Sequence, residues 1–238
     1  MNAPRALIAE TLGTGLLLVA VVGSGIMGER LGGGNDALAL LANTLATATA
    51  LYVLIAIFGP TSGAHFNPAV TLVLRLHGEP TPGPLWAYLL AQIAGAIAGV
   101  LLAHAMFDQP LWQPGDRVRA GTGQWISEGV ATFGLLLTIL LGACHRPRAL
   151  PALVACYIAA AYWFTASTSF ANPAVTLARS LTRSFAGIRP EDVPGFVLAQ
   201  TAGALLAWPV ARVLLPRDAC PPVETTARVS RARAGTDL

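Results

Sequence analysis

Charged side chains are scarce in this chain: they make up 11% of its 238 residues, against about 25% in soluble proteins. Lysine is absent, so all fifteen basic residues are arginine. Hydrophobic residues reach 54%, and the mean hydropathy is +0.60. This composition excludes a soluble globular protein and predicts an integral membrane protein. The net charge of +3 gives no reason to expect a nucleic-acid partner.

Cysteine is also rare, and the three cysteines, Cys144, Cys156 and Cys220, have no metal-ligand spacing. We interpret them as unpaired, small apolar packing residues. No grouping of nucleophile, base and metal ligands appears in the sequence. The sequence therefore predicts no metal, no cofactor and no enzymatic activity.

Long apolar runs are the feature that the chain does have. Six of them approach the roughly 20 residues that a membrane span needs: Ala6–Met27, Ala37–Phe58, Leu85–Phe107, Gln124–Cys144, Ala149–Thr165 and Val193–Leu215. Two further apolar segments, Asn67–Leu76 and Asn172–Leu181, have only half that length. The prediction is an all-α membrane protein with six transmembrane helices and two re-entrant half-helices. The channel domain covers residues 1–220, and residues 221–238 form a disordered tail.

The hexapeptide Asn-Pro-Ala-Val-Thr-Leu occurs twice, at Asn67–Leu72 and Asn172–Leu177. Each half of the chain has the same order of segments: a span with a glutamate, a second span, a half-helix and a span with a glutamine. Three full spans per half is an odd number, so the second half must enter the membrane from the opposite side. The sequence thus predicts inverted repeats over residues 5–107 and 124–215, and such repeats place a substrate site at the bilayer midplane.

Each hexapeptide has the composition of a helix start. Asparagine is a preferred N-cap, and proline is well tolerated at the first helical position. We therefore expect helices that begin at Pro68 and Pro173, capped by Asn67 and Asn172. Inverted symmetry points the two positive helix ends at each other in mid-membrane.

At this point the chain resembles the aquaporin superfamily, the major intrinsic proteins, over about residues 5–215. The residues that carry the resemblance are Ser62-Gly63-Ala64-His65-Phe66-Asn67-Pro68-Ala69-Val70-Thr71, Asn172-Pro173-Ala174, Glu10, Glu128, Gln92 and Gln200. The resemblance implies a homotetramer with one pore per subunit. It also implies passive conduction of water or small neutral solutes without proton leak.

Several polar residues lie within apolar segments, where a carboxylate is costly and is a functional candidate by default. Glu10 and Glu128 either couple transport to protons or accept N–H bonds from the irregular backbone before each half-helix, and their symmetric placement favours the second role. His65 is expected to brace its loop, with pH gating as an alternative. Gln92 and Gln200 are interpreted as interhelical hydrogen-bonding residues at close helix contacts.

The aquaporin pattern has an arginine after the second motif, and here that position is Val175. Counting back from each asparagine without gaps gives Thr47, Ala160 and Ser169 as the other members of the constriction. This predicted ring has no aromatic, histidine or charge, so it predicts a wide opening for solutes larger than water. Arg179 lies one helical turn beyond Val175 and reaches either the outer vestibule or the headgroups and loop carbonyls.

The distribution of arginines predicts the orientation in the membrane. An even number of spans puts both termini on one side, and nine of the fifteen arginines fall in regions on that side: Arg5, Arg75, Arg146 with Arg148, and residues 212–233. The positive-inside rule then predicts a plasma (inner) membrane protein with both termini cytoplasmic.

The Val175 substitution and the stretch Ala160–Thr165 also resemble bacterial aquaglyceroporins of arsenic-resistance operons. That resemblance implies arsenite, As(OH)₃, or methylated arsenicals as cargo beside water and glycerol-like polyols. The alternative is an ion-coupled secondary transporter that uses Glu10 and Glu128.

Overall fold

The computed structural model describes residues 2–215, so the predicted tail at residues 221–238 lies outside the described residues. Within this range the chain forms eight α-helices. They are α1 (Ala3–Gly32), α2 (Asp36–Ser62), α3 (Pro68–His77), α4 (Leu85–Met106), α5 (Thr122–His145), α6 (Leu150–Phe164), α7 (Pro173–Arg179) and α8 (Val193–Leu214). Short 3₁₀ turns, Pro147–Ala149 and Pro190–Asp192, precede α6 and α8. The predicted arrangement of six long helices and two half-helices is confirmed.

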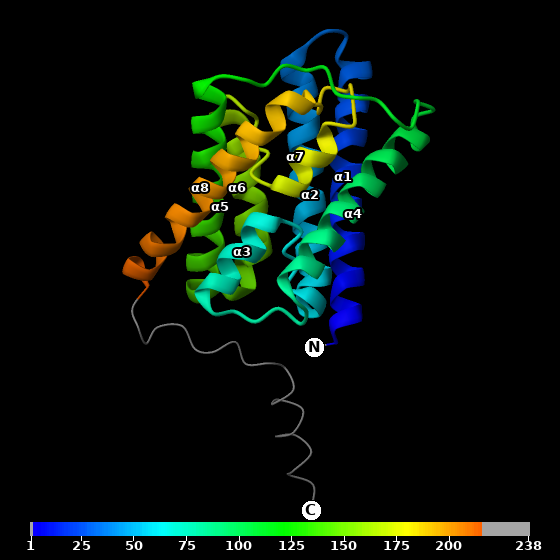
Figure 1. The fold of residues 1–238 in the computed structure, drawn as a ribbon. Coiled ribbons are helices and arrows are strands. Elements are labelled where there is room, and N and C mark those ends of the chain that lie inside the picture. The colour runs from blue at the N-terminus through cyan, green and yellow to red at the C-terminus, as the bar shows by residue number, and fades with distance from the viewer. Residues whose placement is uncertain (1, 216–238) are drawn as a thin grey trace, which may run out of the picture.

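The six long helices run side by side, and α3 and α7 lie among them (Figure 1). α1 starts and α8 ends at one end of the bundle, which we call the termini end. The linker of residues 107–121 crosses the other end near α7, and we call this the linker end. Its Gly115 N–H donates to the Ser180 carbonyl at 2.8 Å.

Five helices of the described chain are long and apolar enough to cross a membrane: α1, α2, α4, α5 and α8 with its leading turn. The sixth, α6, has 15 residues, which gives about 22 Å of helix. Its preceding 3₁₀ turn adds about 6 Å at 2.0 Å per residue, which brings the segment close to the thickness of the hydrocarbon core. Proline at both starts explains why the span is built from two helix types.

Glycine permits two very close helix crossings. A Cβ on Gly95 of α4 would lie 2.2 Å from the Thr11 carbonyl oxygen of α1, and a Cβ on Gly203 of α8 would lie 2.1 Å from the Gly129 carbonyl oxygen of α5. Any other residue would push these helix pairs apart. The expected close contacts near Gln92 and Gln200 are therefore present in both halves.

Two local expectations need correction. α7 ends at Arg179 rather than Leu181, because the chain turns at Ser180, whose N–H donates to the Leu177 carbonyl at 3.2 Å and whose hydroxyl donates to the same oxygen at 2.7 Å. Cys144 is disulfide-bonded rather than unpaired. Cys156 is a free, exposed cysteine on α6, as expected.

Candidate functional site: a pore between two half-helices

The two half-helices start where the sequence predicts and are capped by the two asparagines. The Asn67 side chain accepts from Ala69 N–H at 2.9 Å, and the Asn172 side chain accepts from Ala174 N–H at 3.0 Å. Each asparagine also donates across the junction, Asn67 to the Ala171 carbonyl at 2.8 Å and Asn172 to the Phe66 carbonyl at 2.7 Å. These reciprocal bonds tie each helix start to the loop of the opposite half.

Glu10 organises the loop before α3 from a fully buried position. One carboxylate oxygen accepts from the Ser62 hydroxyl at 2.6 Å and from His65 N–H at 3.0 Å. The other oxygen accepts from Phe66 N–H and from the Gln92 amide, both at 2.8 Å. The same amide nitrogen of Gln92 donates to the Thr71 hydroxyl on α3 at 2.9 Å.

Glu128 repeats this arrangement before α7. One carboxylate oxygen accepts from the Ser167 hydroxyl at 2.6 Å and from Phe170 N–H at 2.8 Å. The other accepts from Ala171 N–H at 2.8 Å and from the Gln200 amide at 2.6 Å. Both carboxylates thus hold irregular backbone that the hydrocarbon region could not solvate, which is the bracing role that their symmetric placement favoured.

The braced loops contain an unusual run of left-handed backbone. Ala64 and Phe66 have φ values of 50° and 49°, and Ser169 and Ala171 have φ values of 50° and 48°. Non-glycine residues adopt this region at a cost, so surrounding contacts must hold them there. The N–H bonds to Glu10 and Glu128 supply that restraint on both sides of the junction.

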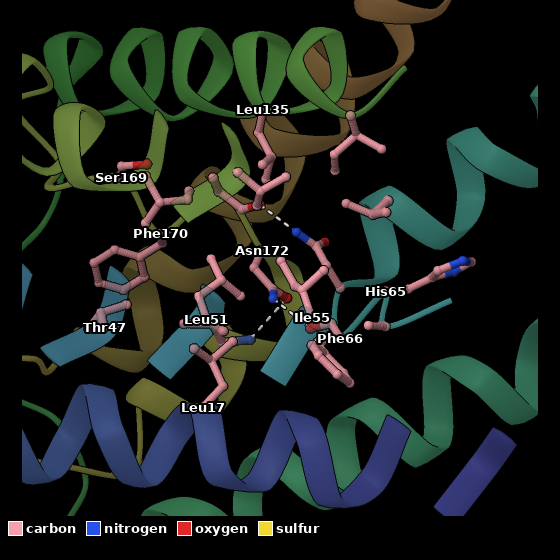
Figure 2. A pocket seen from close by; sticks show the side chains of 18 of the residues that line it. Leu17, Thr47, Leu51, Ile55, His65, Phe66, Leu135, Ser169, Phe170 and Asn172 are labelled. Atoms are coloured by element: carbon pink, nitrogen blue, oxygen red, sulfur yellow. Dashed lines mark hydrogen bonds between the residues drawn. The ribbon is translucent and has the colours of Figure 1, made fainter. Parts of the chain in front are cut away.

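A cavity of about 180 Å³ passes between the two half-helix starts and extends toward both ends of the bundle. Asn67 and Asn172 both line this cavity. Asn172 lies near the middle of the view in Figure 2, with aliphatic side chains such as Leu17, Ile55 and Leu135 around it. Ser169, Phe170 and Thr47 lie toward one end in this view, and His65 lies toward the other. The path is thus lined mainly by apolar side chains, with a few polar groups among them.

Toward the linker end, the lining brings together Thr47, Tyr162, Ser169 and Val175. The Tyr162 hydroxyl donates to the Thr47 hydroxyl at 3.3 Å. The Ser169 hydroxyl is buried and has no hydrogen-bond partner among the described residues. Three hydroxyls and one aliphatic side chain therefore face the path at this level.

The prediction of Ala160 as a ring member, and of a ring without an aromatic, is wrong. Ala160 is exposed on α6 and does not line the cavity, whereas Tyr162 is buried and does. Two residues further along a helix correspond to a rotation of about 200°, so the two side chains point to opposite faces. The ungapped count counted residues along the chain and did not include the rotation of α6, whose cavity-facing side carries Ile158 and Tyr162.

Arg179 lies beyond Val175 and lines the same cavity. Its guanidinium carbon is 3.3 Å from the centre of the Phe170 ring, and its Nε donates to the Ala186 carbonyl. Both alternatives from the sequence are thus partly realised, since the side chain binds a loop carbonyl while it lines the pore. Arg119 from the linker approaches the same ring at 4.9 Å and donates to the Ser167 carbonyl at 3.0 Å.

His65 lines the cavity on the side of the termini end, together with Leu74 and Glu79. Its Nδ1 is 3.1 Å from the Thr71 hydroxyl, and its ring lies 5.6 Å from the Tyr88 ring. These contacts fit the expected bracing of the loop. Glu10, Glu128, Gln92 and Gln200 do not line the cavity but hold the loops that do.

The sequence did not point to Phe170 and Arg119 as site residues. Phe170 corresponds to His65 of the first loop, so its position was available from the repeat. Arg119 lies in a polar linker without a motif, and only its contacts with the Ser167 and Gly187 carbonyls bring it to the site.

A membrane-embedded path between two opposed half-helices, with the coupling candidates Glu10 and Glu128 outside its wall, is the architecture of a channel. The family model described as "MIP: Major intrinsic protein" matches residues 1–164, and the chain belongs to this family. It is a multi-pass membrane channel for small neutral solutes and not an enzyme, so the secondary-transporter alternative is set aside.

The chain is similar in sequence to two named relatives and in fold to one solved structure. It is 60% identical to aquaglyceroporin AqpS of Rhizobium meliloti (strain 1021) over 211 residues, which cover 89% of this chain and 90% of that protein. It is 35% identical to aquaporin TIP2-2 of Zea mays over 60% of this chain and 59% of that one. The fold matches the X-ray structure of the aquaglyceroporin from Plasmodium falciparum with a TM-score of 0.69 at 20% identity, covering 90% of this chain and 98% of that one.

Proposed function

We propose that this channel passes neutral solutes of glycerol size, arsenite among them, in addition to water. The observation that carries the proposal is the set of lining residues Thr47, Tyr162, Ser169 and Val175, which offers three hydroxyls and one aliphatic side chain to the path. A small polyol has the matching chemistry, because its hydroxyls replace lost water while its carbon side meets the apolar wall. As(OH)₃ has the same size class and presents hydroxyls in the same way.

Val175 is the residue that favours solutes larger than water. A guanidinium at this position would add bulk and a fixed charge to the ring, and valine adds neither. The unpartnered hydroxyl of Ser169 supports the same proposal. A hydrogen bond from this buried hydroxyl to a passing solute lowers the free energy of the solute in the pore. The 60% identity to a protein named aquaglyceroporin points in the same direction.

We further propose that ions are excluded at the junction of α3 and α7. Each helix start carries a partial positive charge, and both starts face the cavity at Asn67 and Asn172. The aliphatic wall adds a desolvation barrier for any ion. A neutral solute meets little electrostatic repulsion and a smaller desolvation barrier than an ion, so neutral solutes pass while sodium ions and protons do not.

The assembly and orientation of the channel are also proposals. We propose a homotetramer with one pore per subunit in the plasma membrane, with both termini in the cytoplasm. The arginine distribution supports the orientation. Chemical cross-linking of purified protein and protease protection of tagged termini test these two points separately.

The proposed solute range is tested by stopped-flow light scattering of proteoliposomes with water, glycerol, urea and arsenite. We expect glycerol and arsenite to pass much faster than through protein-free liposomes of the same lipid, with no dependence on a pH or sodium gradient. Water flux without glycerol flux would contradict the proposed solute range.

A further inference from the structure

Three guanidinium groups gather at the linker end of the pore without a carboxylate partner. Arg179 and Arg119 lie 3.3 and 4.9 Å from the Phe170 ring centre, and Arg117 lies 4.7 Å from the Phe185 ring centre. The salt bridges in the described part of the chain involve Arg183 and Arg189 instead. Among the described residues, these three guanidinium groups therefore have no carboxylate within ion-pair distance.

The carboxylates near this entrance are committed to other groups. Asp192 accepts from Arg119 backbone N–H and pairs with Arg189, both at 2.8 Å. Glu29 accepts from Phe185 N–H at 3.1 Å. The buried carboxylate of Glu128 interacts electrostatically with Arg119, but it already accepts four hydrogen bonds, from Ser167, Phe170, Ala171 and Gln200.

The charged form of Arg119, which is 5% exposed, is destabilised at this end of the pore. Burial, followed by repulsion from Arg179 and Arg117, lowers its pKa to about 9, although the charge of Glu128 acts in the opposite direction. At neutral pH the side chain keeps its proton, so the repulsion persists. An anion placed among these groups would relieve it.

Two buried groups at this end have hydrogen-bonding capacity left over. Arg179 is only 2% exposed and lines the cavity, and among the described residues its guanidinium donates one hydrogen bond, from Nε to the Ala186 carbonyl. Its two Nη atoms therefore have no hydrogen-bond acceptor within that part of the chain. The Ser169 hydroxyl, also 2% exposed, lines the same cavity without a partner.

We propose that this entrance is a binding site for a small singly charged oxyanion of the carboxylate class. The planar guanidinium of Arg179 matches the two oxygens of a carboxylate, and the Ser169 hydroxyl donates to one of them. Phe170 and Val175 offer an apolar surface to a short alkyl group. The bound anion occupies the path of neutral solutes and competes with them.

Binding is tested with acetate and its neutral isostere acetamide, by saturation-transfer-difference NMR on the full chain in nanodiscs, with empty nanodiscs as blank. We expect acetate to bind at least about fivefold more tightly than acetamide, because hydrogen bonds to a charged acceptor are roughly twice as strong as neutral ones. Equal binding of the two probes to the unmodified protein would overturn the proposal without any variant.

Variants then locate the site. Arg179→Gln should remove the preference for acetate, and Ser169→Ala should weaken acetate binding by about threefold, the size expected for one neutral donor. Arg183→Gln is the matched control, because Arg183 is 62% exposed and faces Asp116 at 4.0 Å. Acetate preference that survives Arg179→Gln in folded protein would contradict the assignment, and Ser169→Ala tests the site if Arg179→Gln does not fold.

Competition is measured in proteoliposomes that hold equal acetate on both sides, with constant total salt. We expect acetate to slow glycerol flux at concentrations where acetamide has no effect, and the effect should be absent in Arg179→Gln. This arm rests on the proposed function, whereas the NMR arm does not. Acetate binding without any glycerol flux would refute the proposed solute range alone, and glycerol flux without acetate binding would refute the anion site alone.

Discussion

The loops before α3 and α7 share one scaffold but present different walls to the pore. Glu10 and Glu128 accept the same four kinds of hydrogen bond, and Gln92 and Gln200 donate to matching threonines, Thr71 and Thr176. The differences lie at positions that face the cavity: His65 corresponds to Phe170, and Leu74 corresponds to Arg179.

The comparison distinguishes residues that hold the loops in place from residues that line the pore, which the sequence repeat alone does not distinguish. The buried network fixes where each half-helix starts, so it tolerates little change and is repeated. We propose that the cavity-facing positions decide which solutes pass. They differ between the two ends of the pore, while the network that holds the loops is the same in both halves. Substitutions at corresponding positions of the two loops distinguish scaffold from filter.

The largest effect is expected from replacing either carboxylate of the scaffold. Glu10→Gln and Glu128→Gln each put an amide donor against backbone N–H donors, which should destabilise the fold by about 3 kcal/mol. In detergent, both variants should give much less folded protein and have a lower melting temperature than the wild type. The two decreases should be similar for the two variants. The control is Glu191→Gln, because Glu191 is exposed and pairs only with Arg189 at the surface, so this variant should behave as wild type. A large difference between Glu10→Gln and Glu128→Gln would show that the two networks are not equivalent.

A reactive thiol in the cavity should block conduction nearly completely. Ser169→Cys should make glycerol flux sensitive to mercuric chloride, because this position lines the path, and Ala64→Cys should do the same from the corresponding position of the first loop. The unmodified protein should resist, since exposed Cys156 lies away from the cavity wall. Strong block of the unmodified protein that disappears in Cys156→Ser would mean that the pore is placed wrongly.

A moderate effect is expected at the corrected ring position. Tyr162→Ala should raise the flux of polyols longer than glycerol severalfold, because it removes an aromatic ring from the wall. Ala160→Phe, two residues earlier on the outer face of α6, should leave all fluxes unchanged. The measurement is the flux of ribitol and of glycerol in the same proteoliposomes. Fluxes that change in Ala160→Phe but not in Tyr162→Ala would show that Ala160, and not Tyr162, lines the constriction.

The smallest effect is expected at the helix starts. Asn172→Asp and Asn67→Asp are nearly isosteric, and each places a carboxylate at a positive helix end. We expect each variant to admit a small sodium current in planar bilayers while glycerol flux is retained. Sodium current through the unmodified protein would show that the helix starts do not control ion exclusion.

Much of the fold was predictable because its determinants are local. Proline after asparagine fixed the starts of α3 and α7, and apolar length fixed the long helices to within a few residues. The bracing by Glu10 and Glu128 followed from the repeat. In the wall of the pore, Thr47, Ser169 and Val175 line the cavity as expected, whereas Ala160 does not.

The remaining features depend on distances through space that the sequence does not encode locally. The rotation of α6 about its axis puts Tyr162 and not Ala160 in the wall of the pore, and a shift of two residues along a helix reverses the face. The approach of Arg119 to Phe170 depends on how a linker without a motif packs against the loops around α7.

The most direct test of the central claim is the ratio of glycerol to water permeability in Val175→Arg, with Val175→Leu as the control for bulk alone. Both fluxes would be measured by stopped-flow in proteoliposomes of one lipid composition and matched protein density. We predict that the arginine lowers the glycerol-to-water ratio by about tenfold, equivalent to about 1.4 kcal/mol of added barrier, and that leucine lowers it much less. An unchanged ratio in Val175→Arg would contradict the claim that this ring selects the solute.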